Sequence, residues 1–179
     1  MKCSRSFVAA AAALAFVALG PDVARAQAMN PVIHFGATGG FSIPLSDYST
    51  GHQTGYYLSG FGEGTPAGSS VAIRGEVNYS GYTRKPNGSS DNIVGLTANG
   101  IYALENSRSG PYLIGGIGLY HLGSAGGFGV SQNDFGLNVG GGYKWQLADM
   151  STFAEFRVHL ISSTGGSTQI IPITFGVVF

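Results

Sequence analysis

The feature that most constrains this sequence is an alternation of apolar and polar residues that recurs along most of the chain. In the stretch VAIRGEVNY, residues 71–79, Val71, Ile73 and Val77 alternate with Arg74 and Glu76. Successive side chains of an extended strand point to opposite faces, so the two sets lie on different sides of a sheet. Each such segment predicts a β-strand with one apolar and one polar face.

Eight segments follow this pattern, and stretches rich in Gly, Ser, Pro, Asn and Asp separate them. Short strands joined by such turns indicate an all-β, antiparallel, up-and-down sheet. The predicted strands are Val32 to Ile43, Gly55 to Phe61, Val71 to Tyr82, Asn92 to Leu104, Pro111 to Leu122, Asp134 to Trp145, Thr152 to Ser162 and Thr168 to Phe179.

The charged residues well inside these segments share the polar face. They are Arg74, Glu76, Lys144, Glu155 and Arg157. Random placement on a two-faced strand would give this result roughly once in 32 trials. The strand 111–122 is ambiguous, because Leu113, Ile117 and Leu119 compete for the apolar face with Ile114 and Tyr120.

The composition indicates what covers the apolar face. Charged residues make up only 10% of the chain, against about 25% in an average soluble domain. Beyond residue 30 there is no apolar run of the roughly 20 residues that a spanning helix needs. A closed barrel is the other structure that satisfies its backbone inside a bilayer. The sequence therefore predicts an eight-stranded antiparallel transmembrane β-barrel with lipid outside and the charges in its lumen.

The first residues have the pattern of a secretory signal peptide. Lys2 and Arg5 precede an apolar stretch, and small residues supply cleavage sites after residue 26 or 28. We expect residues 1–26 to be removed and residues 27–179 to form the barrel domain. Removal takes the single cysteine, Cys3, and leaves 9 − 3 = 6 basic and 9 − 1 = 8 acidic residues. This balance does not favour nucleic acid as a partner.

The signal peptide, the eight segments and the final stretch FAEFRVHLISSTGGSTQIIPITFGVVF resemble the small outer-membrane β-barrel domain family, which includes OmpA-like and opacity-protein-like barrels. The resemblance implies an outer-membrane location and insertion by the barrel-assembly machinery, which reads a last strand ending in an aromatic residue. Phe179, with Phe175, Ile173 and Ile171, matches that assembly signal. We expect a barrel without the peptidoglycan-binding domain that the two-domain members have after theirs.

An even number of strands predicts that both termini are periplasmic, with external loops around 46–54, 83–91, 123–133 and 163–167. Aromatic residues near the two rims are expected to form girdles at the membrane interfaces. The expected girdle residues are Phe61, Tyr102, Tyr112, Tyr143, Trp145, Phe153 and Phe179 at the periplasmic rim, and Phe41, Tyr56, Tyr57, Tyr79, Tyr82 and Tyr120 at the outer rim.

An eight-stranded barrel is only wide enough for its own side chains to fill. The inward charges are therefore expected to form a network of pairs, with room made by Gly36, Gly40, Gly140 and Gly142. This favours a non-enzymatic protein with a structural, envelope or surface-contact role and no cofactor. The loops contain no recognisable motif, so the surface ligand stays unknown.

Two alternatives stay open. A lipid-modifying barrel enzyme would need a nucleophile, a base and an acid in contact, and the candidates are Ser162 or Ser163, His159 and Glu155. The lipid A deacylase barrels have a serine two residues after the histidine, where this chain has Ile161. A soluble lipocalin-like periplasmic barrel would instead bury the apolar face. The four histidines, His34, His52, His121 and His159, have no metal-ligand spacing.

Overall fold

The computed structural model describes residues 32–65, 69–86, 88–105, 109–124, 132–148, 150–163 and 166–179. The predicted signal peptide, residues 1–26, lies outside the described residues. The elements are β1 (Val32–Leu45), α3 (Ser46–Gly51), β2 (Gly55–Thr65), β3 (Val71–Thr83), β4 (Ser90–Ala103), β5 (Gly110–Ser124), β6 (Gln132–Leu147), β7 (Met150–Ser163) and β8 (Gly166–Val178).

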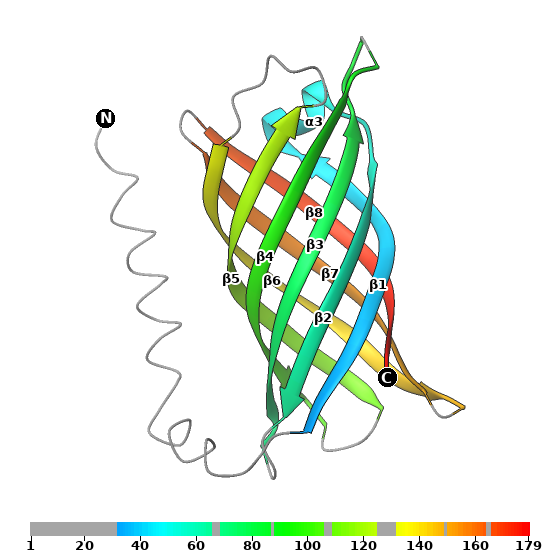
Figure 1. The fold of residues 1–179 in the computed structure, drawn as a ribbon. Helices are drawn as coiled ribbons and strands as arrows, with labels where there is room; N and C mark the ends of the chain where they lie inside the picture. The colour runs from blue at the N-terminus through cyan, green and yellow to red at the C-terminus, as the bar shows by residue number, and fades with distance from the viewer. Residues whose placement is uncertain are drawn as a thin grey trace. The chain divides into compact units, whose positions relative to one another are not determined.

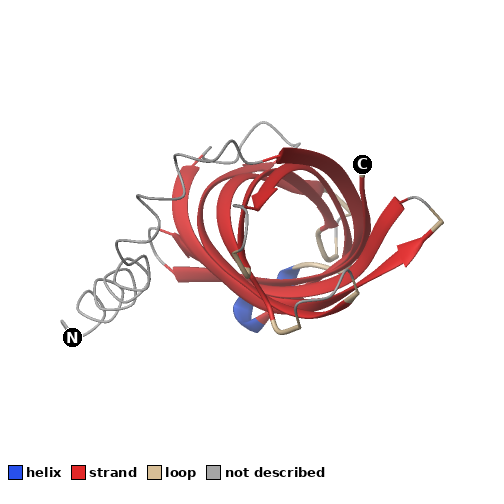
Figure 2. Ribbon diagram, turned by 90° about the horizontal axis from the view of Figure 1, so that it is seen from below, coloured by secondary structure: helices blue, strands red, loops and turns tan. Residues whose placement is uncertain are grey.

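The strands form one closed antiparallel barrel in chain order, which confirms the predicted fold class. Figures 1 and 2 show the ring from the side and along its axis. β8 closes the ring against β1, from Gly36 opposite Val178 to Leu45 opposite Gln169. The start of β1 and the end of β8 lie at one end of the barrel, here named the terminal end. The opposite end carries α3 and is named the α3 end.

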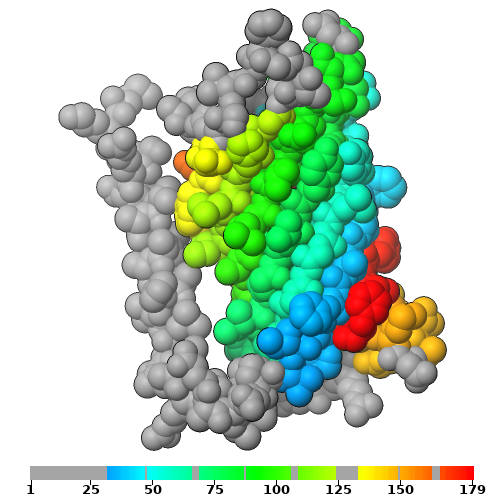
Figure 3. Space-filling model, viewed as in Figure 1, coloured from blue at the N-terminus to red at the C-terminus, as the bar shows by residue number. Residues whose placement is uncertain are grey.

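The barrel wall is apolar outside and polar inside. Phe35, Phe156 and Phe175 are more than half exposed on the outer wall, whereas Arg157 and Glu76 are buried in the lumen. On the face shown in Figure 3, β1 to β5 form a continuous wall. In β5, Leu113, Ile117 and Leu119 are exposed outside, and Ile114 and Tyr120 are buried inside, so the ambiguous strand follows the same rule.

Most strands extend a residue or two beyond the predicted bounds, but β2 differs more. The predicted strand ends too early, at Phe61, because β2 continues to Thr65 and pairs with β1 from Thr65 opposite Val32. The segment FGEGT has a turn-like composition, yet pairing with β1 and β3 on its two sides keeps it extended. Glu63 is consequently a strand residue and is buried.

The segment 46–54 was expected to be a loop and contains the helix α3, which is only six residues long. So short a helix is not stable by itself, and tertiary contacts hold it. The chain turns into it through Ser46, whose φ of 52° lies in the left-handed region. No helix among the described residues is long and apolar enough to cross a membrane.

The expectation of aromatic girdles is wrong for about half of the residues named. Tyr56, Tyr79, Tyr102 and Tyr143 are on the outer wall, as expected. The strand parity turns six others into the lumen, where they are buried: Tyr57, Phe61, Tyr82, Tyr112, Tyr120 and Phe153. Most of these rings fill the barrel interior because an eight-stranded ring leaves a narrow space that large side chains occupy.

Candidate functional site

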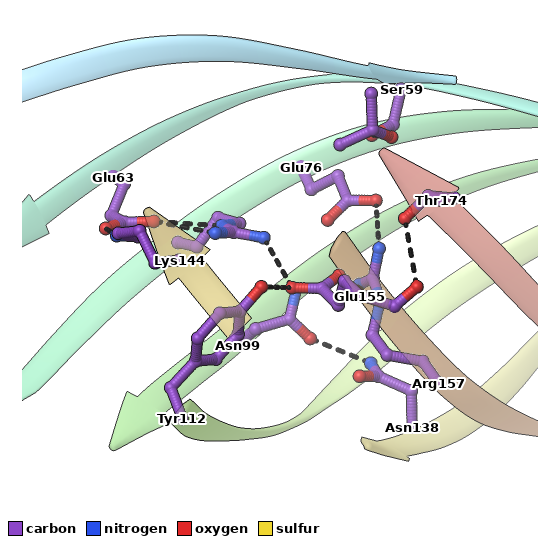
Figure 4. Close-up of polar contacts among 12 residues, drawn as sticks. Ser59, Glu63, Glu76, Asn99, Tyr112, Asn138, Lys144, Glu155, Arg157 and Thr174 are labelled. Atoms are coloured by element: carbon purple, nitrogen blue, oxygen red, sulfur yellow. Dashed lines mark hydrogen bonds and ion pairs between the residues drawn. The ribbon is translucent and has the colours of Figure 1, made fainter. Parts of the chain in front are cut away.

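The five inward charges meet in the lumen, and a sixth residue, Glu63, joins them. Arg74 connects two carboxylates, with its Nη2 2.8 Å from Glu63 Oε2 and its Nη1 3.0 Å from Glu155 Oε2. Arg157 extends the chain of pairs, with Nε 2.9 Å from Glu155 Oε1 and Nη2 2.7 Å from Glu76 Oε1. The first of these Arg157 contacts is an ion pair without hydrogen-bond geometry. Figure 4 shows this arrangement.

At the terminal end the chain of pairs reaches the mouth of the lumen. Lys144 Nζ lies 3.1 Å from the second oxygen of Glu63, and the Lys144 side chain is 26% exposed. The six residues form an alternating series of positive and negative groups, which we name the lumen network: Lys144, Glu63, Arg74, Glu155, Arg157 and Glu76.

Three cations and three carboxylates sum to a net charge of zero in the lumen network. The five residues expected from the sequence sum to +1, and Glu63 supplies the missing negative charge. A buried charge without a partner is strongly unfavourable, so this balance is what allows six ionisable groups in a closed lumen. Sequence reasoning missed Glu63 because the predicted strand ended at Phe61. Its parity with Phe61, Ser59 and Tyr57, all buried, is the signal that could have identified it.

Aromatic residues complete the coordination of the charges. Tyr57 donates its hydroxyl to Glu76 Oε1 at 2.7 Å, and Tyr112 donates to Glu155 Oε2 at the same distance. The Arg74 guanidinium lies 4.2 Å from the ring centroid of Phe61 and 5.0 Å from that of Phe153. The π-electrons of an aromatic ring attract a nearby cation, and the attraction is stronger where water is excluded. Arg74 is therefore paired with two carboxylates and lies close to two aromatic rings.

Glycines give these side chains space, although not all as expected. A Cβ on Gly140 would lie 2.0 Å from Phe156 O and 2.7 Å from the Cα of Arg157, so this glycine does admit the arginine strand closely. A Cβ on Gly36 would meet Phe61, and one on Gly142 would meet Tyr112. Gly40 instead faces the backbone of Ile173. These glycines thus make room mainly for aromatic rings and for the backbone of neighbouring strands.

The lumen nearer the α3 end is less ionic. His159 is fully buried, and its Nδ1 is hydrogen-bonded to the Tyr120 hydroxyl at 2.8 Å. Asn138 donates to Asn99 at 2.8 Å. Beyond them lies an apolar cluster of Tyr82, Ile93, Tyr120, Ile161 and Ile170.

The catalytic candidates do not come together. Glu155 and His159 lie on the lumen face of β7, whereas Ser162 is exposed on the outer wall. The side chain of Ser163 lies outside the described residues. Glu155 is occupied by two arginines, and His159 contacts a tyrosine hydroxyl. The side chains of the lumen network neutralise one another and fill the lumen.

No metal centre is apparent in the described ranges, since they contain no group of three or more His, Cys, Asp or Glu side chains able to hold a metal ion. A cavity of about 120 Å³ opens near the terminal end, bordered by Glu63, Lys144 and Tyr112 among others. It is the mouth of the lumen network and has the volume of only a few water molecules.

The four residues of the predicted assembly signal follow the outer wall of β8. Phe179 and Phe175 are about two-thirds exposed, Ile173 is 44% exposed and Ile171 is partly buried. Phe179 also extends the seam between the first and last strands, because its N–H donates to Phe35 O at 2.7 Å. Recognition of this face by an assembly machinery stays a prediction.

Comparison with known proteins supports the fold alone. No protein-family model and no curated protein matches this sequence. Among solved structures, the crystal structure of Neisserial surface protein A (NspA) matches with a TM-score of 0.66 and 18% identity, covering 82% of this chain and 95% of that chain.

Two further crystal structures match with a TM-score of 0.51. The N-terminal β-barrel domain of Pseudomonas aeruginosa OprF is 14% identical, with 82% of this chain and 96% of that chain covered. Ail, the attachment invasion locus protein of Yersinia pestis, is 13% identical, with 84% and 100% covered. The chain therefore shares the fold of small eight-stranded outer-membrane barrels, as the resemblance implied.

Proposed function

We propose that this chain is a small, non-enzymatic integral protein of the bacterial outer membrane, with a closed lumen and a structural or surface-contact role at its loops. The observation that carries the proposal is the polarity of the wall, with large apolar side chains outside and a neutral ionic network inside. This polarity is stable with lipid around the barrel. The soluble lipocalin-like alternative needs the reverse polarity.

The closed lumen supports a role other than passive conduction. Ion pairs run from Lys144 near one mouth to Glu76, and the apolar cluster with Tyr82 and Tyr120 follows towards the other mouth. Side chains therefore fill the axis, as expected for eight strands. We expect no permanent pore in a planar bilayer.

The α3 end is the side on which we expect contact with other molecules. With both termini periplasmic, α3 and the neighbouring loops face outwards. The names of two proteins that share the fold, a surface protein and an attachment invasion locus protein, favour a role in surface contact. Outer-membrane lipid surrounds the wall in this proposal, and the barrel-assembly machinery is the partner during insertion.

The experiment that tests the membrane proposal compares unheated and boiled outer-membrane fractions by gel mobility. We expect a fast-migrating folded band that boiling removes. Deletion of Phe179 should weaken this band, while Phe179→Tyr, the matched control, keeps an aromatic terminus and should leave it unchanged. A soluble periplasmic protein without a mobility shift would overturn the proposal.

The enzyme alternative has its own test. His159 has no exposed surface through which to reach a lipid, which supports a packing role for this residue. We expect mass spectra of lipid A to be the same in strains expressing the wild type, His159→Ala or Ser163→Ala, and a strain without the protein. A change in lipid A acylation that requires the wild-type chain and is lost in His159→Ala would show an enzyme.

A further inference from the structure

The short helix α3 is placed to act as a lid on one end of the lumen. It packs against β1 and β8, and Ser46 Oγ donates to Gln169 Oε1 at 3.2 Å. Tyr48 presents its ring edge-on to Tyr82, with 5.5 Å between centroids, and packs on the apolar cluster at the α3 end. α3 thus packs over the apolar cluster at this end of the lumen through Tyr48.

One histidine fastens the lid to the start of β4. His52 is 9% exposed, stacks on the Tyr48 ring at 3.9 Å and places its Nε2 2.7 Å from Asp91 Oδ2. Arg84 binds the same carboxylate oxygen through Nη2 at 2.6 Å. Two backbone bonds run beside this cluster, from Gln53 N to Thr83 O and from Lys85 N to Gly51 O.

The contacts of His52 distinguish its two protonation states. Its Nδ1 lies 3.0 Å from the Tyr48 carbonyl oxygen, and its Nε2 faces the Asp91 carboxylate. Both partners can only accept, so both contacts are hydrogen bonds only when both ring nitrogens carry a proton. A neutral ring has one N–H and leaves one nitrogen against an acceptor.

The charged and aromatic groups that face His52 come from several elements. Asp91 lies on β4, and Arg84, which follows β3, shares its carboxylate from a side chain that is 47% exposed. Tyr48 on α3 and Tyr82 on β3 contribute rings. Burial raises the pKa of the Tyr48 hydroxyl, with Tyr82 and Asp91 adding to the effect, so Tyr48 stays neutral near physiological pH.

We propose that α3 is a proton-controlled lid, which is held closed over the α3 end of the lumen when His52 is protonated and loosens when the ring loses its proton. Lower pH therefore closes the lid, because the doubly protonated ring bridges Tyr48 and Asp91. Higher pH removes one of the two bonds and exposes the aromatic end of the lumen more often. Histidine is the side chain type that usually changes charge between mildly acidic and neutral conditions.

The test is amide hydrogen exchange of the full-length protein folded in phospholipid vesicles, measured at Gln53 and Lys85. Rates at about pH 6 and about pH 8 are divided by those of an unstructured peptide under the same conditions. For the wild type we expect corrected exchange about threefold to tenfold faster at the higher pH, the range that one lost hydrogen bond allows. His52→Gln cannot take up a proton and should show no such difference.

His121→Gln is the matched control. His121 is exposed on β5 at the same end of the barrel and binds Asn133 Oδ1 at 2.9 Å, so its replacement should keep the wild-type pH difference. Asp91→Asn offers a second variant if His52→Gln does not fold, and it should reduce the difference. Equal corrected rates in the wild type, or a pH difference that persists in His52→Gln, would overturn the lid. The readout needs no assumption about the cellular location.

Discussion

The two ends of this barrel are closed by different means. Towards the terminal end, the lumen is filled by strand side chains that pair charge with charge, from Lys144 to Glu76. At the α3 end, the lumen holds an apolar cluster, and a separate helix covers it through His52 and Tyr48. One closure is part of the wall itself, and the other is an added segment.

This difference determines which closure can move. Removing one member of the lumen network leaves buried opposite charges, so opening it is expensive. Moving α3 breaks a few hydrogen bonds and exposes part of one ring, which costs far less. A barrel can therefore keep a rigid plug at one end and a responsive surface at the other.

The largest effect should follow from breaking the lumen network at its centre. Arg74→Met removes the cation shared by Glu63 and Glu155, and we expect the free energy of unfolding to fall by about 3–5 kcal/mol. Guanidinium unfolding of the protein in vesicles measures this. Lys144→Met, at the partly exposed mouth, should cost no more than about 1 kcal/mol. Equal losses for the two variants would contradict a graded network.

A smaller effect on the free energy of unfolding should distinguish glycines packed against backbone from glycines packed against side chains. A Cβ on Gly140 would meet backbone atoms in the ionic half, so Gly140→Ala should lower the free energy of unfolding by about 1–3 kcal/mol. At Gly95, nearer the α3 end, the three nearest atoms all belong to side chains, the amide of Asn78 and the ring of Tyr120, and not to backbone. Gly95→Ala should therefore cost less than Gly140→Ala in the same unfolding assay. If Gly95→Ala costs more, the α3 half is the more rigid one.

The smallest effect on global stability should come from the lid. Tyr48→Ala removes a partly buried ring that packs on the apolar cluster and on His52, and we expect a loss of about 1 kcal/mol. Amide exchange at Gln53 should nevertheless rise, because the lid opens without unfolding the barrel. A loss as large as that of Arg74→Met would mean that α3 is integral to the barrel.

Sequence periodicity was sufficient to predict the two faces of the barrel wall, because alternate residues of a strand point outwards and inwards. In β7, the alternation of Glu155, Arg157 and His159 with Phe156 and Leu160 predicts the buried and exposed sets that the structure has. This works because burial inside a barrel wall follows a period of two, which needs only local information.

The sequence was less informative where position depends on distant residues. Glu63 lies in a turn-like segment, and only its pairing with Arg74 and Lys144 on other strands explains its burial. The cluster of His52, Arg84 and Asp91 unites a residue that follows α3, one that follows β3 and one at the start of β4. Six helical residues contain too little periodicity to predict α3. Nothing in the sequence spacing of His52, Arg84 and Asp91 indicates that these side chains would meet.

The pairing of β1 with β8 gives the barrel a built-in test of completeness. β1 can pair on its second side only when β8 is present. A partly synthesised or truncated chain therefore has two unpaired strand edges. Such edges are sites for aggregation and proteolysis, whereas the closed ring has none. Pairing of β8 with β1 is thus the single step that distinguishes a closed barrel from a shorter chain with open edges.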